Sequence, residues 1–211
     1  MQPGQPSTSS HQIVMEYRSP EGAEVTQVRG AVLHASLQQL KQASLYDRYL
    51  AALPHQHHEG VLYSLASSWL PLEVASAHCA AVDALGLSER TLEEHGQQIG
   101  EQLATTLFAA VLRTALSMAA GSGKGWALLK LTDRVMQRLY HGGCATLLQA
   151  GPKDAVMEIR GLPLFTSRYF RNSHHGYIKN LIGLVSTTVY VKPVRPREPH
   201  PHSAATSISW V

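Results

Sequence analysis

Cysteine and charge are both scarce in this sequence of 211 residues, which contains two cysteines and 16% charged residues. Two cysteines, Cys79 and Cys144, are too few for a disulfide framework, so the composition indicates a reducing cytosol and a cytoplasmic location. No apolar run has the length that a membrane-spanning helix needs, and residues 1–10 are too polar to form the core of a secretory signal. We therefore expect no membrane span.

An excess of basic charge is missing as well, because 18 basic and 15 acidic residues give a formal net charge of only +3. Proteins that bind nucleic acid usually concentrate basic side chains on one face, so we expect no nucleic-acid partner. Hydrophobic residues, in contrast, make up 44% of the chain. At this length, that fraction predicts one domain with a sizeable buried core.

The first residues differ in composition from the rest of the chain. Residues 1–23 are rich in Gln, Pro and Ser, and we expect a disordered tail there. An alternative interpretation of residues 13–18 is a short edge strand. Residues 24–211 are then expected to form a single α+β domain.

Helical periodicity dominates the first two thirds of this domain. Residues 31–53 carry apolar side chains at helical spacing, but the phase slips near residue 43, which predicts two consecutive helices. Ser44 and Asp47 resemble a capping box at the start of the second helix.

A longer helical pattern follows after residue 88. Ser88 or Thr91 is expected to cap a helix that we predict to continue to Met118, as the longest of the chain. Gly96 and Gly100 lie one turn apart in this pattern, which predicts that another backbone approaches closely there.

The last third of the sequence has a different character. Residues 144–150 and 155–160 flank a Gly-Pro-Lys-Asp segment and predict a β-hairpin. A helix is expected over residues 166–185, and strands over residues 187–194 and 205–211. The order of elements predicts an α+β fold, with an N-terminal helical layer followed by a small antiparallel sheet on which a further helix packs.

Several short motifs in the chain support a resemblance to a known family. The most specific is Ser67-Ser68-Trp69-Leu70-Pro71-Leu72-Glu73, and the others are Val28-Arg29-Gly30, Leu103-Ala104-Thr105-Thr106, Gly151-Pro152, Glu158-Ile159-Arg160-Gly161 and Ser207-Ile208-Ser209-Trp210-Val211. From about residue 28 onward, the chain resembles a family of uncharacterised myxobacterial proteins. That family is distantly similar to 4-vinyl-reductase-like ligand-binding domains, to heme-NO-associated domains and to TRAPP-type subunits of vesicle-tethering complexes.

The resemblance implies an apolar pocket between helices and sheet, and pairing into dimers. Related domains often carry cysteines near the last two strands, where these cysteines can bind metal or report redox state. Here Ala204, Ala205 and Thr206 occupy that region, and no cysteine follows Cys144. We therefore expect no structural metal of that kind and no bound cofactor.

No convincing catalytic constellation is present, so we predict a non-enzymatic sensory or regulatory domain that binds a small apolar ligand or a protein partner as a homo- or heterodimer. The alternative is a structural adaptor that binds other proteins without a ligand. Predicted packing places the ligand pocket between the long helix and the sheet, and each of its residues is equally compatible with the core. The expected lining residues are Trp69, Leu103, Leu107, Val111, Phe165 and Tyr169.

A heme- or metal-binding protein is the last of the three hypotheses. His55, His57 and His58 have metal-binding side chains, but a solvated turn explains them equally well. His78 and Cys79 lie in a predicted helix and offer an axial ligand for heme, with core packing as the alternative.

Overall fold

The protein is described from a computed structural model that covers residues 12–119, 121 and 123–211. Its helices are α1 (Gly30–Gln42), α2 (Tyr46–Ala52), α3 (His58–Leu62), α4 (Leu72–Asp83), α5 (Glu89–Thr105), α6 (Ala109–Met118), α7 (Gly123–Leu129), α8 (Thr132–Leu139) and α9 (Arg168–Gly183), with short 3-10 helices η1 (His55–His57) and η2 (Pro163–Thr166). Its strands are β1 (Gln12–Arg18), β2 (Gln27–Arg29), β3 (Trp69–Pro71), β4 (Tyr140–His141), β5 (Cys144–Gly151), β6 (Asp154–Arg160), β7 (Val189–Val194) and β8 (Ser203–Trp210).

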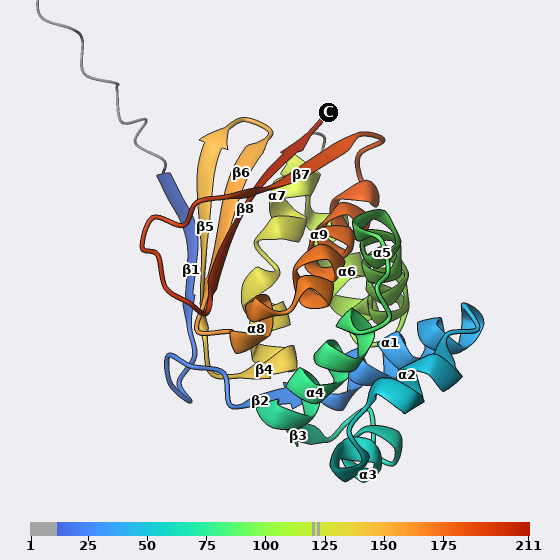
Figure 1. The fold of residues 1–211 in the computed structure, drawn as a ribbon. Helices are drawn as coiled ribbons and strands as arrows, with labels where there is room; N and C mark the ends of the chain where they lie inside the picture. Colours follow the sequence, from blue (N-terminus) through green and yellow to red (C-terminus); the bar gives the residue numbers. More distant parts are fainter. Residues whose placement is uncertain (1–11, 120, 122) are drawn as a thin grey trace, which may run out of the picture.

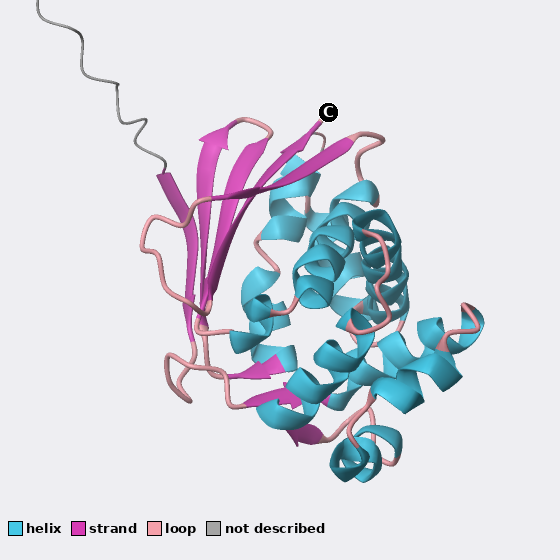
Figure 2. Ribbon diagram, viewed as in Figure 1, coloured by secondary structure: helices cyan, strands magenta, loops and turns pink. Residues whose placement is uncertain are grey.

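The elements form a sheet with helices packed on one side of it. Figure 1 shows α7, α8 and α9 next to the sheet, α5 and α6 behind them, and α1–α4 gathered at one end of the molecule. Figure 2 shows the same separation of strands and helices. The predicted α+β fold is confirmed. Within the described residues, no helix combines the length and the apolar character needed to cross a membrane.

The main sheet has five antiparallel strands in the order β1-β5-β6-β8-β7. Strands β5 and β6 form the predicted hairpin, with Leu147 opposite Met157. Strand β1 pairs with β5 at one edge, so residues 12–18 of the expected tail form the edge strand that was the alternative interpretation. Residues 1–11 of that tail lie outside the described residues.

A second sheet of three short strands, in the order β3-β2-β4, was not expected from the sequence. Val28 in β2 lies opposite both Leu70 in β3 and Tyr140 in β4. This sheet connects the N-terminal helices to the segment that enters the main sheet. Trp69 begins strand β3 of this sheet, and α4 follows that strand directly.

Two helices, α1 and α2, replace one continuous helix over residues 30–52, as predicted. The predicted capping box is wrong, because Leu45 occupies the N-cap of α2 and no side chain accepts a hydrogen bond there. Ser44 has a φ of 57° and reverses the chain between the helices. Its left-handed backbone belongs to the end of α1, and this position cannot cap α2.

A single helix from residue 88 to Met118 is also wrong, because α5 ends at Thr105 and α6 begins at Ala109. The hydroxyl of Thr106 donates to the carbonyl of Gln102 at 2.7 Å, and a threonine hydroxyl that bonds a helical carbonyl competes with the backbone ladder. The predicted start is confirmed, since the Ser88 side chain accepts from the Thr91 N–H at 3.1 Å.

Helices α5 and α9 approach so closely that their backbones touch. A Cβ atom added at Gly96 would lie 2.0 Å from the Ser173 carbonyl oxygen, and one added at Gly176 would lie 1.9 Å from the Glu93 carbonyl oxygen. The predicted close approach at Gly96 is therefore confirmed. Lys179 and Glu93 form an ion pair across the same interface.

Candidate ligand-binding site

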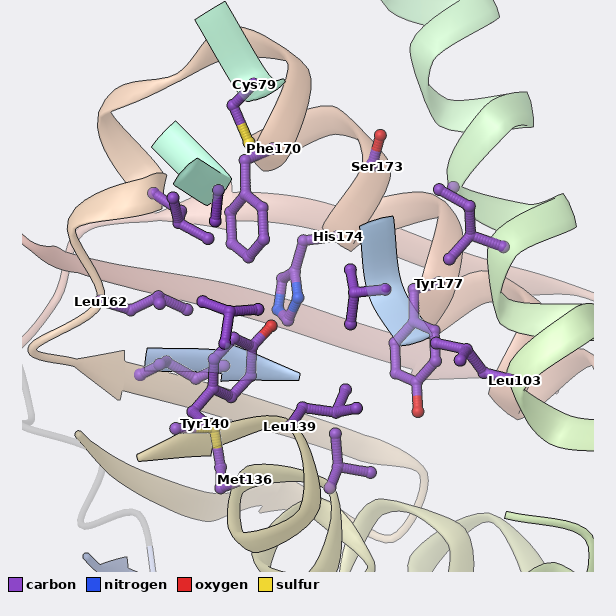
Figure 3. Close-up of a pocket in the computed structure, with 18 of the residues that line it drawn as sticks. Cys79, Leu103, Met136, Leu139, Tyr140, Leu162, Phe170, Ser173, His174 and Tyr177 are labelled. Atoms are coloured by element: carbon purple, nitrogen blue, oxygen red, sulfur yellow. The ribbon is translucent and has the colours of Figure 1, made fainter. Parts of the chain in front are cut away.

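An apolar cavity of about 90 Å³ lies where α1, α4, α5, α8 and α9 meet β2, β4 and β6. Its lining is mostly aliphatic and aromatic, with Leu103, Met136, Leu139, Leu162 and Phe170 among its members (Figure 3). Within the described residues, no arginine, lysine, aspartate or glutamate lines it. The cavity therefore offers an apolar ligand a site but offers a charged ligand no counter-ion.

His174 is the polar side chain that stands out in this lining. Its ring points into the space enclosed by the lining residues, between Phe170 and Tyr140 (Figure 3). The centroid of the ring lies 5.3 Å from that of Phe165 in an edge-on arrangement. Burial lowers the pKa of His174 to about 3, so the imidazole is neutral at pH 7.

No hydrogen bond joins the His174 ring to another group in the part of the chain that the structure describes, and the pKa of His174 is set by desolvation and by His175. The hydroxyls of Tyr140 and Tyr177 are similarly unpaired among the described residues, and burial raises the pKa of both phenols. A neutral imidazole and two protonated phenols therefore face apolar surroundings. Together they offer donors and an acceptor without net charge.

The carboxylate of Asp83 fixes the position of α9, which carries His174 and Tyr177. Asp83 is the last residue of α4, and its carboxylate accepts hydrogen bonds from the N–H of Tyr169 at 2.6 Å and the N–H of Arg168 at 3.1 Å. These N–H groups belong to the first turn of α9. The N–H groups of a first turn have no hydrogen-bond partner within the helix, and the helix dipole favours a negative charge beside them. The contact anchors α9 to α4 at one end of the cavity.

A second histidine at the cavity, His78, is fully engaged in hydrogen bonds. Its Nδ1 lies 2.8 Å from the Tyr49 hydroxyl, and its Nε2 lies 3.0 Å from the Ser36 hydroxyl. The Ser36 oxygen also lies 2.7 Å from the hydroxyl of Tyr169 and 3.2 Å from Nε2 of His95. Five side chains from α1, α2, α4, α5 and α9 thus share one buried network.

Protons can be placed through this network in either direction so that each of its four contacts joins one donor and one acceptor. Burial lowers the pKa of His78 to about 3 and that of His95 to about 4, so both imidazoles are neutral at pH 7. Ser36 itself is completely buried. A Ser–His pair is therefore present, but its hydroxyl has no access to a substrate, and the network stabilises the junction of the helices.

Cys79, next to His78, lines the cavity with a buried thiol. Desolvation raises the pKa of this thiol well above its usual value. The thiol is thus protonated at neutral pH and contributes apolar surface to the cavity.

Two of the six residues expected in the pocket, Leu103 and Tyr169, line the cavity. Phe165 is buried in η2 and packs edge-on against His174, one layer outside the lining. Leu107 lies in the break between α5 and α6, and Val111 lies on α6. The interruption of the long helix thus separates these two residues from the cavity.

Trp69 lies in the small sheet, away from the cavity. The guanidinium of Arg29 lies 3.8 Å from its ring centroid, and the ring of His141 lies 3.6 Å from it, centroid to centroid. The indole therefore packs between a cation and an imidazole at the junction of β2, β3 and β4.

The cluster of His55, His57 and His58 spans η1 and the start of α3. The rings of His55 and His58 stack at 5.0 Å, and Nε2 of His58 lies 2.9 Å from the carbonyl oxygen of Leu53. Within the described residues, no group of three metal-ligand atoms forms there. Such a group forms elsewhere, from Glu24, His200 and His202, which the sequence analysis did not single out.

The fold is similar to that of solved H-NOX (heme-NO/oxygen binding) proteins. The Fe(II) unliganded H-NOX protein from K. algicida superposes with a TM-score of 0.59 at 8% identity, covering 87% of this chain and 96% of that one. A point mutant of T. tengcongensis H-NOX gives 0.52 at 12% identity, covering 86% and 97%. An H-NOX structure solved to probe heme distortion gives 0.54 at 14% identity, covering 86% and 94%.

No family model matches the chain, and no curated protein matches it. At these identities, the likeness to H-NOX concerns the fold alone. It supports the heme-NO-associated part of the resemblance seen in the sequence, whereas the myxobacterial family stays a prediction.

The cavity does not fit heme. A volume of about 90 Å³ is far below the roughly 300 Å³ at which pockets for larger ligands begin. The two propionates of heme would also need basic partners, and the described lining has none. His174 has the side chain of an axial ligand, but its surroundings suit a smaller, uncharged molecule.

Proposed function

We propose that this protein is a non-enzymatic sensory domain whose cavity binds a small, uncharged, mostly apolar ligand through a hydrogen bond to His174. The observation that carries the proposal is the neutral imidazole that points into the apolar cavity without a hydrogen-bond partner among the described residues (Figure 3). The likeness to a sensor fold supports the sensory role.

The energetics of an unpaired polar group favour such a ligand. A polar group that is removed from water without a partner costs free energy, and a ligand that supplies the partner recovers much of this cost. A charged ligand would add its own desolvation penalty, and no opposite charge lines the cavity to offset it. The ligand class is therefore a small alcohol, ketone or similar molecule with one hydrogen-bonding group.

Cyclopentanone and cyclopentane form a suitable pair of probes, because they share a ring size and differ in the carbonyl. We expect cyclopentanone to raise the melting temperature of the wild-type protein more than cyclopentane does. His174→Leu keeps an apolar side chain at the same place, and we expect it to abolish this preference for the ketone. His175→Leu, which changes the next residue outside the cavity lining, is the matched control and is expected to retain it.

Equal shifts with both probes, or a preference that persists in His174→Leu, would contradict the proposal. Titration with hemin tests the size and charge argument separately. We expect no Soret band of bound heme, and a stoichiometric band that depends on His174 would show that the cavity opens to a macrocycle.

We also expect the protein to form a dimer, because the family resemblance seen in the sequence implies pairing. Analytical ultracentrifugation of the free and cyclopentanone-bound protein measures it directly. We expect a dimer, and a monomer under both conditions would remove this part of the proposal.

A further inference from the structure

Glu24, His200 and His202 lie close together at the surface, next to the backbone of Leu162. Nδ1 of His202 lies 3.2 Å from one carboxylate oxygen of Glu24, and Nε2 of His200 lies 3.9 Å from the other. One ligand atom from each residue falls within 4.8 Å of the other two. The three side chains are partly exposed, so an ion can reach them from solvent.

The backbone that carries Glu24 is held between two glycine turns. Gly142 and Gly161 have φ values of 103° and 73°, and a Cβ atom on either would lie within 2.0 Å of a carbonyl oxygen in the segment of residues 23–24. The N–H of Val25 donates to the carbonyl of Gly161 at 2.7 Å. The position of Glu24 is therefore set by packing that does not depend on its side chain.

The backbone that carries the histidines is fixed as well. Ser203 Oγ donates to the carbonyl of His200 at 2.7 Å, and the N–H of Leu162 donates to the carbonyl of His202 at 2.9 Å. Pro199 and Pro201 flank His200 and restrict its backbone further. The loop between β7 and β8 thus presents both imidazoles toward Glu24 without needing to fold around an ion.

The geometry suits one divalent transition-metal ion. Bonds of about 2.0–2.2 Å to imidazole nitrogen and carboxylate oxygen place two ligand atoms roughly 3.4 Å apart around a tetrahedral ion. The separations of 3.2 Å from His202 and 3.9 Å from His200, each to a different oxygen of the Glu24 carboxylate, lie on either side of this value, and one ligand atom from each residue lies within 4.8 Å of the other two. Two imidazoles and a carboxylate favour zinc, nickel, cobalt or ferrous iron over calcium or magnesium.

Neighbouring arginines do not prevent binding, because carboxylates already engage them. Arg197 donates to Glu158 at 3.0 Å, and Arg160 pairs with Glu198. One hydrogen bond must be given up, since the N–H of His202 donates to Nδ1 of His200, which has to carry a proton once Nε2 binds metal. That bond is long, at 3.3 Å, so its loss opposes binding only weakly.

We propose that Glu24, His200 and His202 form a binding site for a divalent transition metal, with solvent in the remaining position. The ion would join the β7–β8 loop to the segment before β2. One of its ligands, His202, accepts a hydrogen bond at its carbonyl from the N–H of Leu162, which lines the cavity. The proposal rests on these surface residues and is independent of what the cavity binds.

Isothermal titration of tag-free protein with zinc chloride tests the site, with cobalt absorption spectra as a second readout of the ligand geometry. We expect one ion per chain. His202→Ala and Glu24→Gln are each expected to weaken binding at least tenfold and to remove the cobalt spectrum. His57→Ala removes a histidine from the cluster of His55, His57 and His58. We expect this variant to leave the zinc affinity and the cobalt spectrum unchanged.

Circular dichroism checks that the variants fold, which the exposure of the three side chains favours. Absence of binding to the wild-type protein would overturn the proposal. Binding that survives in His202→Ala and is lost in His57→Ala would overturn it too, and would assign the ion to the other cluster.

Discussion

His78 and His174 line the same cavity, and burial lowers the pKa of each to about 3. The two histidines differ in their hydrogen-bond partners. Both nitrogens of His78 have partners, Tyr49 and Ser36. His174 has apolar neighbours such as Phe165 and no partner among the described residues. Burial and a lowered pKa are therefore common to both histidines, and the unused hydrogen-bonding capacity of His174 is the feature on which its proposed role in ligand binding rests.

Replacing each histidine by leucine gives the largest expected contrast. His78→Leu leaves the hydroxyl of Tyr49 without its partner and takes one partner from Ser36, and an unsatisfied buried group costs about 1–3 kcal/mol. We expect a loss of about 3 kcal/mol in the free energy of unfolding, measured by urea denaturation. His174→Leu removes a polar group that has no partner to lose, so we expect a change smaller than about 1 kcal/mol. Equal losses in the two variants would contradict the comparison.

Acid sensitivity gives the next largest effect. His78 and His174 each have a pKa of about 3 in the folded state, below the value of about 6.5 in the unfolded state, so the unfolded chain binds more protons as pH falls. The stabilisation is present above pH 6.5 and is lost progressively toward pH 3. His174→Leu removes one of these groups, and we expect its loss of stability between pH 7 and pH 5 to be about 2 kcal/mol smaller than that of the wild type.

The pH experiment compares urea midpoints at both pH values in the wild type and the variant. His57→Ala, on the exposed turn, serves as the control for removing a histidine as such. If His174→Leu and the wild type lost stability in parallel, the imidazole of His174 would have to be accessible to protons in the folded state.

Two tyrosines on α9 give the smallest and most selective contrast. The hydroxyl of Tyr169 lies 2.7 Å from that of Ser36, whereas the hydroxyl of Tyr177, a residue of the cavity lining, has no hydrogen-bond partner among the described residues. We expect Tyr169→Phe to lower the free energy of unfolding by about 1 kcal/mol, and Tyr177→Phe to change it by less than about 0.5 kcal/mol. Thermal and urea denaturation of the pair measure this, and the reverse order would show that the network is not as described.

Local signals in the sequence were sufficient for much of the fold. The Gly-Pro pair at residues 151–152 predicted the β5–β6 hairpin, and Ser88 predicted the start of α5, because both signals act over a few residues. The break after Thr105 was missed because the apolar periodicity continues through it. Hydroxyl bonds back to the helical carbonyls interrupt the helix there, and periodicity does not report them.

The site was less predictable than the fold. The spacing of Phe170, His174, Ile178 and Leu181 places His174 on an apolar helical face, and this signal was available in the sequence. Sequence alone could not show that Ser36 reaches His78 while nothing reaches His174, because those partners come from helices distant in the chain. Glu24 and His202 are further apart still, and only the packed sheet brings them together.

The contact between Gly96 and Ser173 has a mechanical consequence for the cavity. Helices α5 and α9 have no side-chain layer between them at this point, so they cannot slide past one another without a backbone collision. They act as one rigid wall of the cavity. The opposite wall is α8, a short helix that presents Val135, Met136 and Leu139 to the same space. We therefore expect a ligand that enlarges the cavity to displace α8, which continues directly into β4 and so into the small sheet of β2, β3 and β4.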